Sequence, residues 1–352
     1  MEFQVYRDHL RQTPMMQPQD AVKLAYQSAY GCGHLLPGRE TCVEMIRREW
    51  QQMPEQDVPV YTFIGNGLCR LNLAAPQVRR LDAEMIWRMM DGTDRVVRAR
   101  KDVDLRLKGM IGAVTDLAHK GETGFSYQAL RTYLDGYDGE VVSHTQLYRD
   151  AYHPSYRVVL EDYALLVPVL AEIRQGRRVV AFDGPCGSGK TTLAGRLAEL
   201  LHCTPIPMDD FFLPPDMRTP ERLAQPGGNV HRERFMAEVL ASLPGEVHWL
   251  RFDCGTGNMI PRCIPESAVT VIEGSYSHHP AFADDYERLQ VLRVFVEVQP
   301  NEQLRRIAKR DPEMLSMFQS RWIPLEKNYF EAYDIRGRAD VIIASPERSG
   351  KA

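Results

Sequence analysis

The chain has 352 residues, and at roughly 100–200 residues per domain two domains are the natural expectation. Its 43 Lys and Arg against 47 Asp and Glu give a net charge of −4, which argues against a nucleic-acid-coating protein because phosphate contacts need a basic surface. The 7 cysteines show no CxxC spacing, the first residues lack the apolar core of a signal peptide, and no apolar run approaches the roughly 18 residues of a membrane span. We therefore expect a cytoplasmic protein with reduced thiols that binds neither nucleic acid nor membrane.

Residues 1–173 predict a mainly helical domain, with helix-like segments near 18–30, 41–52, 82–90 and 99–119. Three histidines stand out in it: His34 between glycine-rich turns, and His144 and His153 in a tract rich in polar aromatics. Their spacing matches no metal-binding pattern, and glycines beside His34 suit a helix end as well as close ligand approach. The sequence assigns this domain no chemistry.

Residues 174–352 show a different pattern. Short apolar runs at 179–182, 247–252, 268–272, 292–298 and 339–343 alternate with helical segments such as 192–202, 232–243 and 301–310. Strands alternating with helices indicate an α/β domain in which a parallel sheet carries helices on both faces.

Residues 184–191, GPCGSGKT, match the P-loop (Walker A) pattern GxxxxGK[ST] at every fixed position, between a predicted strand and a predicted helix. In such a loop the backbone N–H groups and the helix N-terminus cradle phosphates, Lys190 reaches the β- and γ-phosphates, and the Thr191 hydroxyl ligates Mg²⁺. A glycine-rich turn that merely links strand to helix is the alternative. The predicted nucleotide-binding residues are Gly184, Gly187, Ser188, Gly189, Lys190, Thr191 and Thr192.

Two acidic positions follow predicted strands: Asp209 comes after residues 205–208, the likely end of the second strand, and Glu273 after the run 268–272. Asp209, in the sequence MDDFF, lies where an open parallel sheet binds its ligands, and a carboxylate there can accept the proton of an attacking hydroxyl. Adjacent aspartates such as Asp209 and Asp210 also form ordinary caps and turns. Glu273 ends the run 268–272 as a Walker-B acid does, so we predict metal ligands at Thr191 and Glu273; a plain strand-terminal glutamate is the alternative.

A kinase needs positively charged side chains that stabilise the negative charge on the transferred phosphoryl group. Arg306 and Arg310 are four residues apart and share a face of the predicted helix 301–310, and Arg321 follows after a short interval. A solvated basic helix has the same pattern. We predict catalytic contacts from Lys190, Arg306 and Arg310, and an acceptor contact from Arg321.

The P-loop, the MDDFF tract and the sequence IEGSY at 272–276 together resemble the uridine kinase, phosphoribulokinase and pantothenate kinase group, over about residues 177–345. The resemblance implies that Asp209 is the catalytic base, that Glu273 is the strand-end acid, and that Arg306 and Arg310 belong to a lid over ATP. The tract 321–330 also looks like that of poorly characterised, uridine-kinase-like bacterial proteins.

Two departures bear on the acceptor. Pyrimidine-nucleoside kinases of this group carry a ribose-binding Asp where this chain has His231, and the segment after their third strand contains a His and an Arg that are missing around Asp253. A site built on hydrogen bonds fails when its partners are missing, so uridine is not the expected acceptor. His231 and Asp253 nevertheless stay candidate acceptor contacts, beside Asp209 and Arg321.

The sequence therefore predicts an enzyme that uses ATP and Mg²⁺ to phosphorylate a hydroxyl of a small-molecule acceptor. The alternative is an ATP-sensing P-loop module that switches the N-terminal domain and phosphorylates no acceptor. Asp209 separates the two, since a sensor needs Lys190 and Thr191 but no base. The identity of the acceptor, the choice of ATP over GTP and the oligomeric state stay open.

Overall fold

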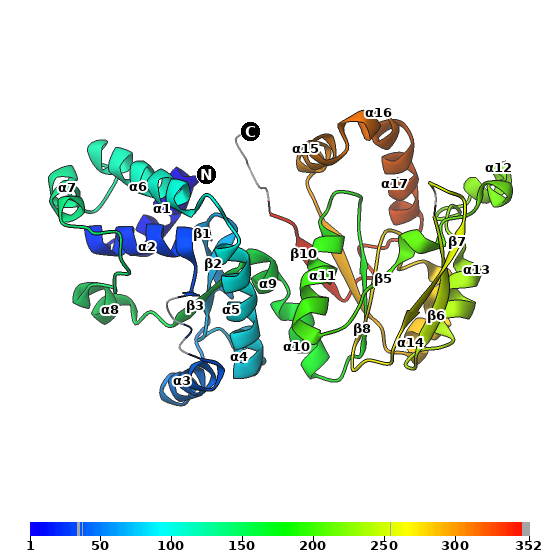
Figure 1. Cartoon of the computed structure of the whole chain (residues 1–352), viewed down its shortest axis with the longest axis horizontal. Coiled ribbons are helices and arrows are strands. Elements are labelled where there is room, and N and C mark those ends of the chain that lie inside the picture. Colours follow the sequence, from blue (N-terminus) through cyan, green and yellow to red (C-terminus); the bar gives the residue numbers. More distant parts are fainter. Residues whose placement is uncertain (34–35, 37, 254, 347–352) are drawn as a thin grey trace. The chain divides into compact units, whose positions relative to one another are not determined.

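A computed structural model of the chain describes residues 1–33, 36, 38–253 and 255–346 (Figure 1). The described residues form two compact units, Met1–Val167 and 168–346. Both this division and the boundary expected from the sequence, between residues 173 and 174, fall within helix α10 (Val167–Arg174). Within the described ranges, no helix is long and apolar enough to cross a membrane.

The first unit is built mainly of helices, as the sequence predicts, together with a small sheet (Figure 1). Its helices are α1 (Glu2–Gln12), α2 (Pro18–Tyr30), α3 (Arg39–Gln52), α4 (Pro76–Arg79), α5 (Ala83–Arg98), α6 (Val103–His119), α7 (Tyr127–Asp135), α8 (Gln146–Tyr152) and α9 (Glu161–Leu165). The strands β1 (Tyr61–Gly65), β2 (Leu68–Asn72) and β3 (Tyr156–Leu160) pair antiparallel in that order. This sheet was not predicted, because β2 and β3 are short and helices α4 to α8 separate them in sequence.

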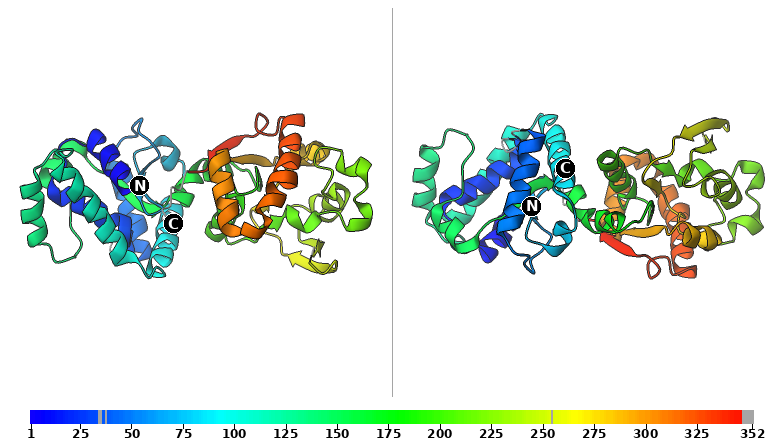
Figure 2. Two further views of the ribbon diagram at one scale, coloured as in Figure 1. Left: turned by 90° about the horizontal axis from the view of Figure 1, so that it is seen from above. Right: turned by 90° about the horizontal axis from the view of Figure 1, so that it is seen from below.

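The second unit contains a five-stranded sheet in the order β10-β9-β4-β8-β5, and every strand pair in it is parallel. The strands are β4 (Val179–Asp183), β5 (Ile206–Pro207), β8 (Thr270–Glu273), β9 (Leu292–Glu297) and β10 (Val341–Ala344). The flanking helices are α11 (Lys190–Leu201), α12 (Pro220–Leu223), α13 (Arg232–Phe235), α14 (Ala283–Arg288), α15 (Pro300–Arg310), α16 (Leu315–Met317) and α17 (Ile323–Ala332). A parallel sheet with helices packed around it (Figures 1 and 2) confirms the predicted α/β class.

The prediction that residues 247–252 join the parallel sheet is wrong. They form β6 (Val247–Phe252), which pairs antiparallel with β7 (Met259–Ile264) in a separate two-stranded hairpin. Buried and exposed residues alternate along much of β6, as in a ribbon with one face in solvent, whereas β4 is buried throughout. Strand β7 was not predicted, because it is mostly exposed and contains Pro261.

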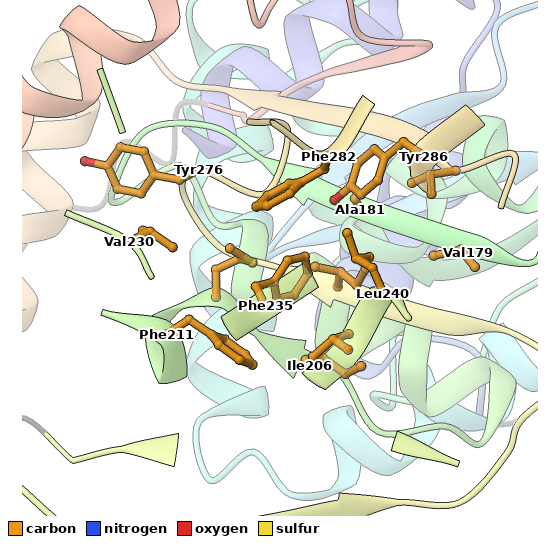
Figure 3. Close-up of a cluster of buried hydrophobic side chains, with 14 of the residues drawn as sticks. Val179, Ala181, Ile206, Phe211, Val230, Phe235, Leu240, Tyr276, Phe282 and Tyr286 are labelled. Atoms are coloured by element: carbon orange, nitrogen blue, oxygen red, sulfur yellow. The ribbon is translucent and has the colours of Figure 1, made fainter. Parts of the chain in front are cut away.

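A buried hydrophobic cluster includes Ile206 of β5, Phe211 and Phe235 (Figure 3). The ring centroids of Phe211 and Phe235 are 5.2 Å apart, and those of Phe235 and Phe282 are 5.0 Å apart. Phe211 is fully buried in this cluster, so the short 3₁₀ turn η2 (Met208–Phe211) is anchored at its last residue. This packing fixes the direction in which the two preceding aspartates point.

Candidate active site

The predicted P-loop follows β4 and leads directly into α11, which begins at Lys190. Gly184, Gly187 and Gly189 have φ angles of 141°, 75° and 97°, which L side chains rarely adopt. A Cβ at Gly184 would lie 2.3 Å from the carbonyl oxygen of Val296, so only glycine fits at the start of the loop. The backbone thus has the strand–loop–helix form in which P-loops bind phosphate.

Asp183, the last residue of β4, holds the start of this loop. Its fully buried carboxylate accepts hydrogen bonds from the backbone N–H groups of Gly184 (2.7 Å), Tyr276 (3.2 Å) and His278 (2.9 Å). The hydroxyl of Tyr329 donates a fourth bond of 2.9 Å. Since a buried carboxylate is costly unless its oxygens are bonded, this network fixes the loop relative to the segment after β8.

Glu326, on α17, is a second buried acid that the sequence reasoning missed as a site residue. One of its oxygens accepts a 2.8 Å hydrogen bond from the backbone N–H of Cys186 in the P-loop. The other lies 2.6 Å from the Ser275 hydroxyl, which is 3.1 Å from the carbonyl oxygen of Gly184. No short spacing connects Glu326 to the loop, so a motif search could not have found it.

Two polar groups at the P-loop lack partners of the usual kind. The Lys190 ammonium group donates a long hydrogen bond of 3.3 Å to the carbonyl oxygen of Pro185 and forms no ion pair with any described carboxylate. The buried Ser188 hydroxyl has no hydrogen-bond partner within the described ranges. A phosphate group would satisfy both, and together with the positive-φ glycines they fit the predicted nucleotide.

The two predicted metal ligands lie together. The Thr191 hydroxyl donates a 2.9 Å hydrogen bond to a carboxylate oxygen of Glu273, the last residue of β8. Burial raises the pKa of Glu273, the bond from Thr191 lowers it, and the neighbouring Asp209 raises it again. A hydroxyl and a crowded carboxylate form the kind of oxygen donor set that Mg²⁺ prefers.

Asp209 and Asp210 are adjacent but have different surroundings. Asp210 is buried, accepts a 2.8 Å hydrogen bond from the Trp249 indole and lies 3.7 Å from the Arg251 guanidinium. Asp209 is exposed, and no hydrogen bond or ion pair engages it among the described residues. Because Phe211 is anchored below, the turn directs Asp210 into the protein and leaves Asp209 open.

The position of Asp209 follows from strand pairing. Pro207 at the end of β5 pairs with Glu273 at the end of β8, so Asp209 follows the strand beside the P-loop acid. Although part of the Asp209 side chain reaches solvent, the protein atoms packed around it raise its pKa by desolvation. Lys190 lowers this pKa, Asp210 raises it and Arg310 lowers it. The structure therefore brings the predicted base, the P-loop lysine and the predicted metal ligand into one electrostatic environment.

The predicted arginines have unlike surroundings. Arg306, on α15, donates to the P-loop carbonyl oxygens of Gly187 (3.2 Å) and Ser188 (3.1 Å) and to Glu302 (2.7 Å), so it braces the loop from the carbonyl side. Arg310 is exposed and lies 5.7 Å from the Phe318 ring centroid. The phosphoryl contacts of these two residues stay predictions.

The predicted acceptor residues are only partly brought together. The His231 backbone N–H donates a 2.7 Å bond to the Phe211 carbonyl oxygen, so His231 lies beside the turn that carries Asp209. Arg321 is exposed and stacks over Trp322, whose ring is 6.3 Å from that of Phe212. Their contacts with an acceptor stay predictions.

Asp253 lies instead in the turn of the β6–β7 hairpin. Its carboxylate accepts 3.0 Å bonds from the Gly255 N–H and from the Thr256 hydroxyl. Both carboxylate oxygens are therefore bonded within the turn. Asp253 occupies this turn because residues 247–252, expected to be a strand of the parallel sheet, form one strand of the hairpin. An acceptor contact by Asp253 also stays a prediction.

The histidines of the first unit have structural surroundings. His144 is buried between Asp20 (Nδ1 to Oδ1, 2.9 Å) and Tyr156 (Nε2 to hydroxyl, 2.7 Å), and burial lowers its pKa to about 4. His153 ends α8 in a left-handed conformation and is exposed. His34 lies outside the described residues.

No family model and no curated protein matches the chain. Two solved structures illustrate what it is similar to. A possible uridine kinase from Bacillus stearothermophilus has 21% identity, with 48% of this chain and 89% of that chain covered and a TM-score of 0.33. A putative fructose transport system kinase from Silicibacter sp. TM1040 has 23% identity, with 47% and 89% covered and a TM-score of 0.36. The P-loop fold of the second unit is evident from its own sheet and loop.

Proposed function

We propose that the second unit transfers a phosphoryl group from Mg-ATP to a hydroxyl of a small-molecule acceptor. The observation that carries this proposal is the contrast between Asp209 and Asp210. Asp210 is bonded into the protein through Trp249, whereas Asp209 faces solvent close to Lys190 and Glu273. A nucleotide sensor has no need of a carboxylate held open at this position, but a kinase needs a base there.

The residues of the P-loop fit the nucleotide. Lys190 and the backbone N–H groups of the loop would hold its phosphates, and Thr191 and Glu273 would hold Mg²⁺ directly or through water. When bound, Mg-ATP supplies the phosphoryl group and the metal charge that offsets developing negative charge. The Arg306 guanidinium binds the carbonyl oxygens of Gly187 and Ser188, and so keeps these two oxygens turned away from the phosphates.

Asp209 acts on the acceptor. Its carboxylate accepts the proton of the acceptor hydroxyl as that oxygen attacks, and it is left as a neutral carboxylic acid. The raised pKa of Asp209 makes it a stronger base than an ordinary aspartate. The nearby positive charge of Lys190 lowers the pKa of Asp209 and so favours its carboxylate form.

The acceptor is a polar metabolite other than uridine. The loop after Phe212 contains arginines that could meet an anionic acceptor, yet their guanidinium groups are engaged. Arg218 donates to the Leu213 carbonyl oxygen (2.7 Å), and Arg222 binds Glu233 and two backbone carbonyl groups. These contacts favour a neutral hydroxyl compound over a phosphorylated one.

The test is a screen of a metabolite library for acceptor-dependent ADP release, with uridine and cytidine included. The proposal expects at least one neutral polyhydroxyl compound to raise ADP release in the wild type but not in Asp209→Asn. Asp216→Asn changes another exposed aspartate of the same loop and should retain activity. ATP binding without any acceptor-dependent release would favour the sensing module, and efficient uridine phosphorylation would overturn the proposed specificity alone.

A further inference from the structure

The hairpin of β6 and β7 carries three metal-binding side chain types on one exposed face. His248 and Cys263 are directly opposite each other in the strand register. Glu246 is the residue before β6, and its carboxylate contacts the His248 ring directly, so the two side chains lie on the same side of the hairpin. All three residues are exposed, and their ligand atoms lie within 4.8 Å of one another.

The two distances from the Cys263 sulfur to the other ligand atoms are close to those of a tetrahedral zinc site. Zinc–sulfur bonds of about 2.3 Å and zinc–oxygen or zinc–nitrogen bonds of about 2.0 Å place sulfur about 3.5 Å from the other two ligand atoms. The Cys263 sulfur lies 3.6 Å from a Glu246 carboxylate oxygen and 3.9 Å from Nε2 of His248. Glu246 and His248 contact each other directly, so a metal ion would replace this contact and the hydrogen bond that the Cys263 thiol donates to Glu246.

The backbone beneath the three residues is fixed from the opposite face. Trp249, between His248 and Leu250, points inward, is 6% exposed and donates its indole N–H to Asp210. Six residue pairs from Val247↔Ile264 to Phe252↔Met259 hold the two strands in register. The ligands therefore stand on an ordered ribbon, which reduces the conformational entropy lost when an ion binds.

The mixture of donor atoms selects the class of ion. A thiolate, an imidazole and a carboxylate suit Zn²⁺ and similar transition-metal ions, whereas Mg²⁺ and Ca²⁺ prefer oxygen ligands alone. Three protein ligands leave one tetrahedral position for water or an external ligand. The oxygen ligands predicted at the P-loop, Thr191 and Glu273, form a different kind of site.

We propose that Glu246, His248 and Cys263 form a surface binding site for a Zn²⁺-class transition-metal ion with three protein ligands and an open fourth position. This site is independent of the phosphotransfer proposed above. Binding releases the thiol proton of Cys263, and the metal–sulfur bond takes its place.

Cobalt titration of the reduced full-length chain, in excess Mg²⁺ to fill oxygen-only sites, tests the proposal. We expect one Co²⁺ per chain with a thiolate-to-cobalt charge-transfer band in the near ultraviolet, displaced by one equivalent of Zn²⁺. Cys263→Ser should abolish the band, while Cys203→Ser, at a half-buried thiol of the same unit, should keep it. His248→Gln and Glu246→Gln should each weaken binding at least about tenfold, because even outer-shell partners of metal ligands contribute that much.

The three side chains are exposed, so these substitutions leave the fold intact, and circular dichroism melting curves of the variants should match the wild type. Absence of a charge-transfer band in the wild type would overturn the proposal. So would a band that persists at equal strength in Cys263→Ser, since the sulfur would then come from another cysteine.

Discussion

The two units each contain a cluster of polar and charged side chains, and the clusters differ in how far the protein satisfies them. In the first unit, Asp20 is fully buried and accepts bonds from His144, from both the N–H and the hydroxyl of Thr145, and from the Gln17 N–H. In the second unit, Lys190 has no carboxylate partner and Asp209 no hydrogen bond, among the residues described.

The difference separates structural from functional polar groups. A fully bonded buried network stabilises one conformation of the protein that contains it. A charged group held without its natural partner destabilises the free protein and is available to a ligand. The comparison therefore predicts opposite effects of substitution in the two clusters: loss of stability in the first unit and loss of activity in the second.

Lys190→Ala should have the largest effect on activity. The change removes the cation of the P-loop, and we expect phosphotransfer to fall at least about 10³-fold, since even one neutral donor to developing charge is worth about 10²–10³-fold. The thermal stability of the second unit should be unchanged or higher, because a buried ammonium group without an ion-pair partner is removed. Acceptor-dependent ADP release and calorimetry measure the two effects, and undiminished turnover would contradict the P-loop assignment.

Asp209→Asn should lower kcat by about 10²–10⁴-fold while ATP affinity is retained, as removal of a positioned base does. Because desolvation raises the pKa of Asp209, the free enzyme loses the base form as pH falls through a value above that of an ordinary aspartate. The acidic limb of the kcat/KM profile should report this pKa in the wild type and be absent from the residual activity of the variant. A loss of less than about threefold would make Asp209 a structural residue.

Asp20→Asn should act in the opposite way. The change weakens hydrogen bonds to His144 and Thr145 inside the protein, and a buried polar group left without its partner typically costs about 1–3 kcal/mol. Hydrogen exchange of amides in α2 should accelerate by about 10²-fold, with kcat changed less than about twofold. A matched control is Asp8→Asn, at a partly exposed aspartate of α1 that should leave exchange unchanged. A large loss of kcat without faster exchange would contradict the division between the two clusters.

Much of the second unit could be predicted from sequence because its signals are local. The P-loop is eight consecutive residues between a strand and a helix, and β4, β8, β9 and β10 are short apolar runs where the sequence placed them. Asp209 and Glu273 were found as strand-end acids, and parallel pairing then places them at one edge of the sheet.

What the sequence did not reveal depends on contacts between distant residues. Glu326 reaches the P-loop from α17, and the small sheet of the first unit pairs strands that are far apart in the chain. The hairpin of β6 and β7 was missed because β7 is exposed and carries no apolar period. Asp209 and Asp210 were indistinguishable in sequence, since only the burial of Phe211 and the indole of Trp249 decide which of them points inward.

Glu273→Gln should have the smallest effect of the four substitutions. It tests whether Glu273 is a ligand-binding group, like Lys190 and Asp209, or a structural one. Glu273 is bonded to Thr191, so by hydrogen bonds alone it belongs with the satisfied groups. Burial and the neighbouring Asp209 raise the pKa of Glu273, because both disfavour a negative charge on its carboxylate. The amide keeps the size of the side chain and can still accept the Thr191 hydrogen bond, so stability should change little.

The charge of Glu273 is what a divalent cation needs. We expect the Mg²⁺ concentration for half-maximal activity to rise about tenfold in Glu273→Gln, as for loss of a metal-supporting partner, with kcat largely recovered at high Mg²⁺. Glu266→Gln, at an exposed glutamate just before β8, should leave this concentration unchanged. If Glu273→Gln instead lowers kcat equally at every Mg²⁺ concentration, the residue acts through Thr191 and the loop rather than through the metal.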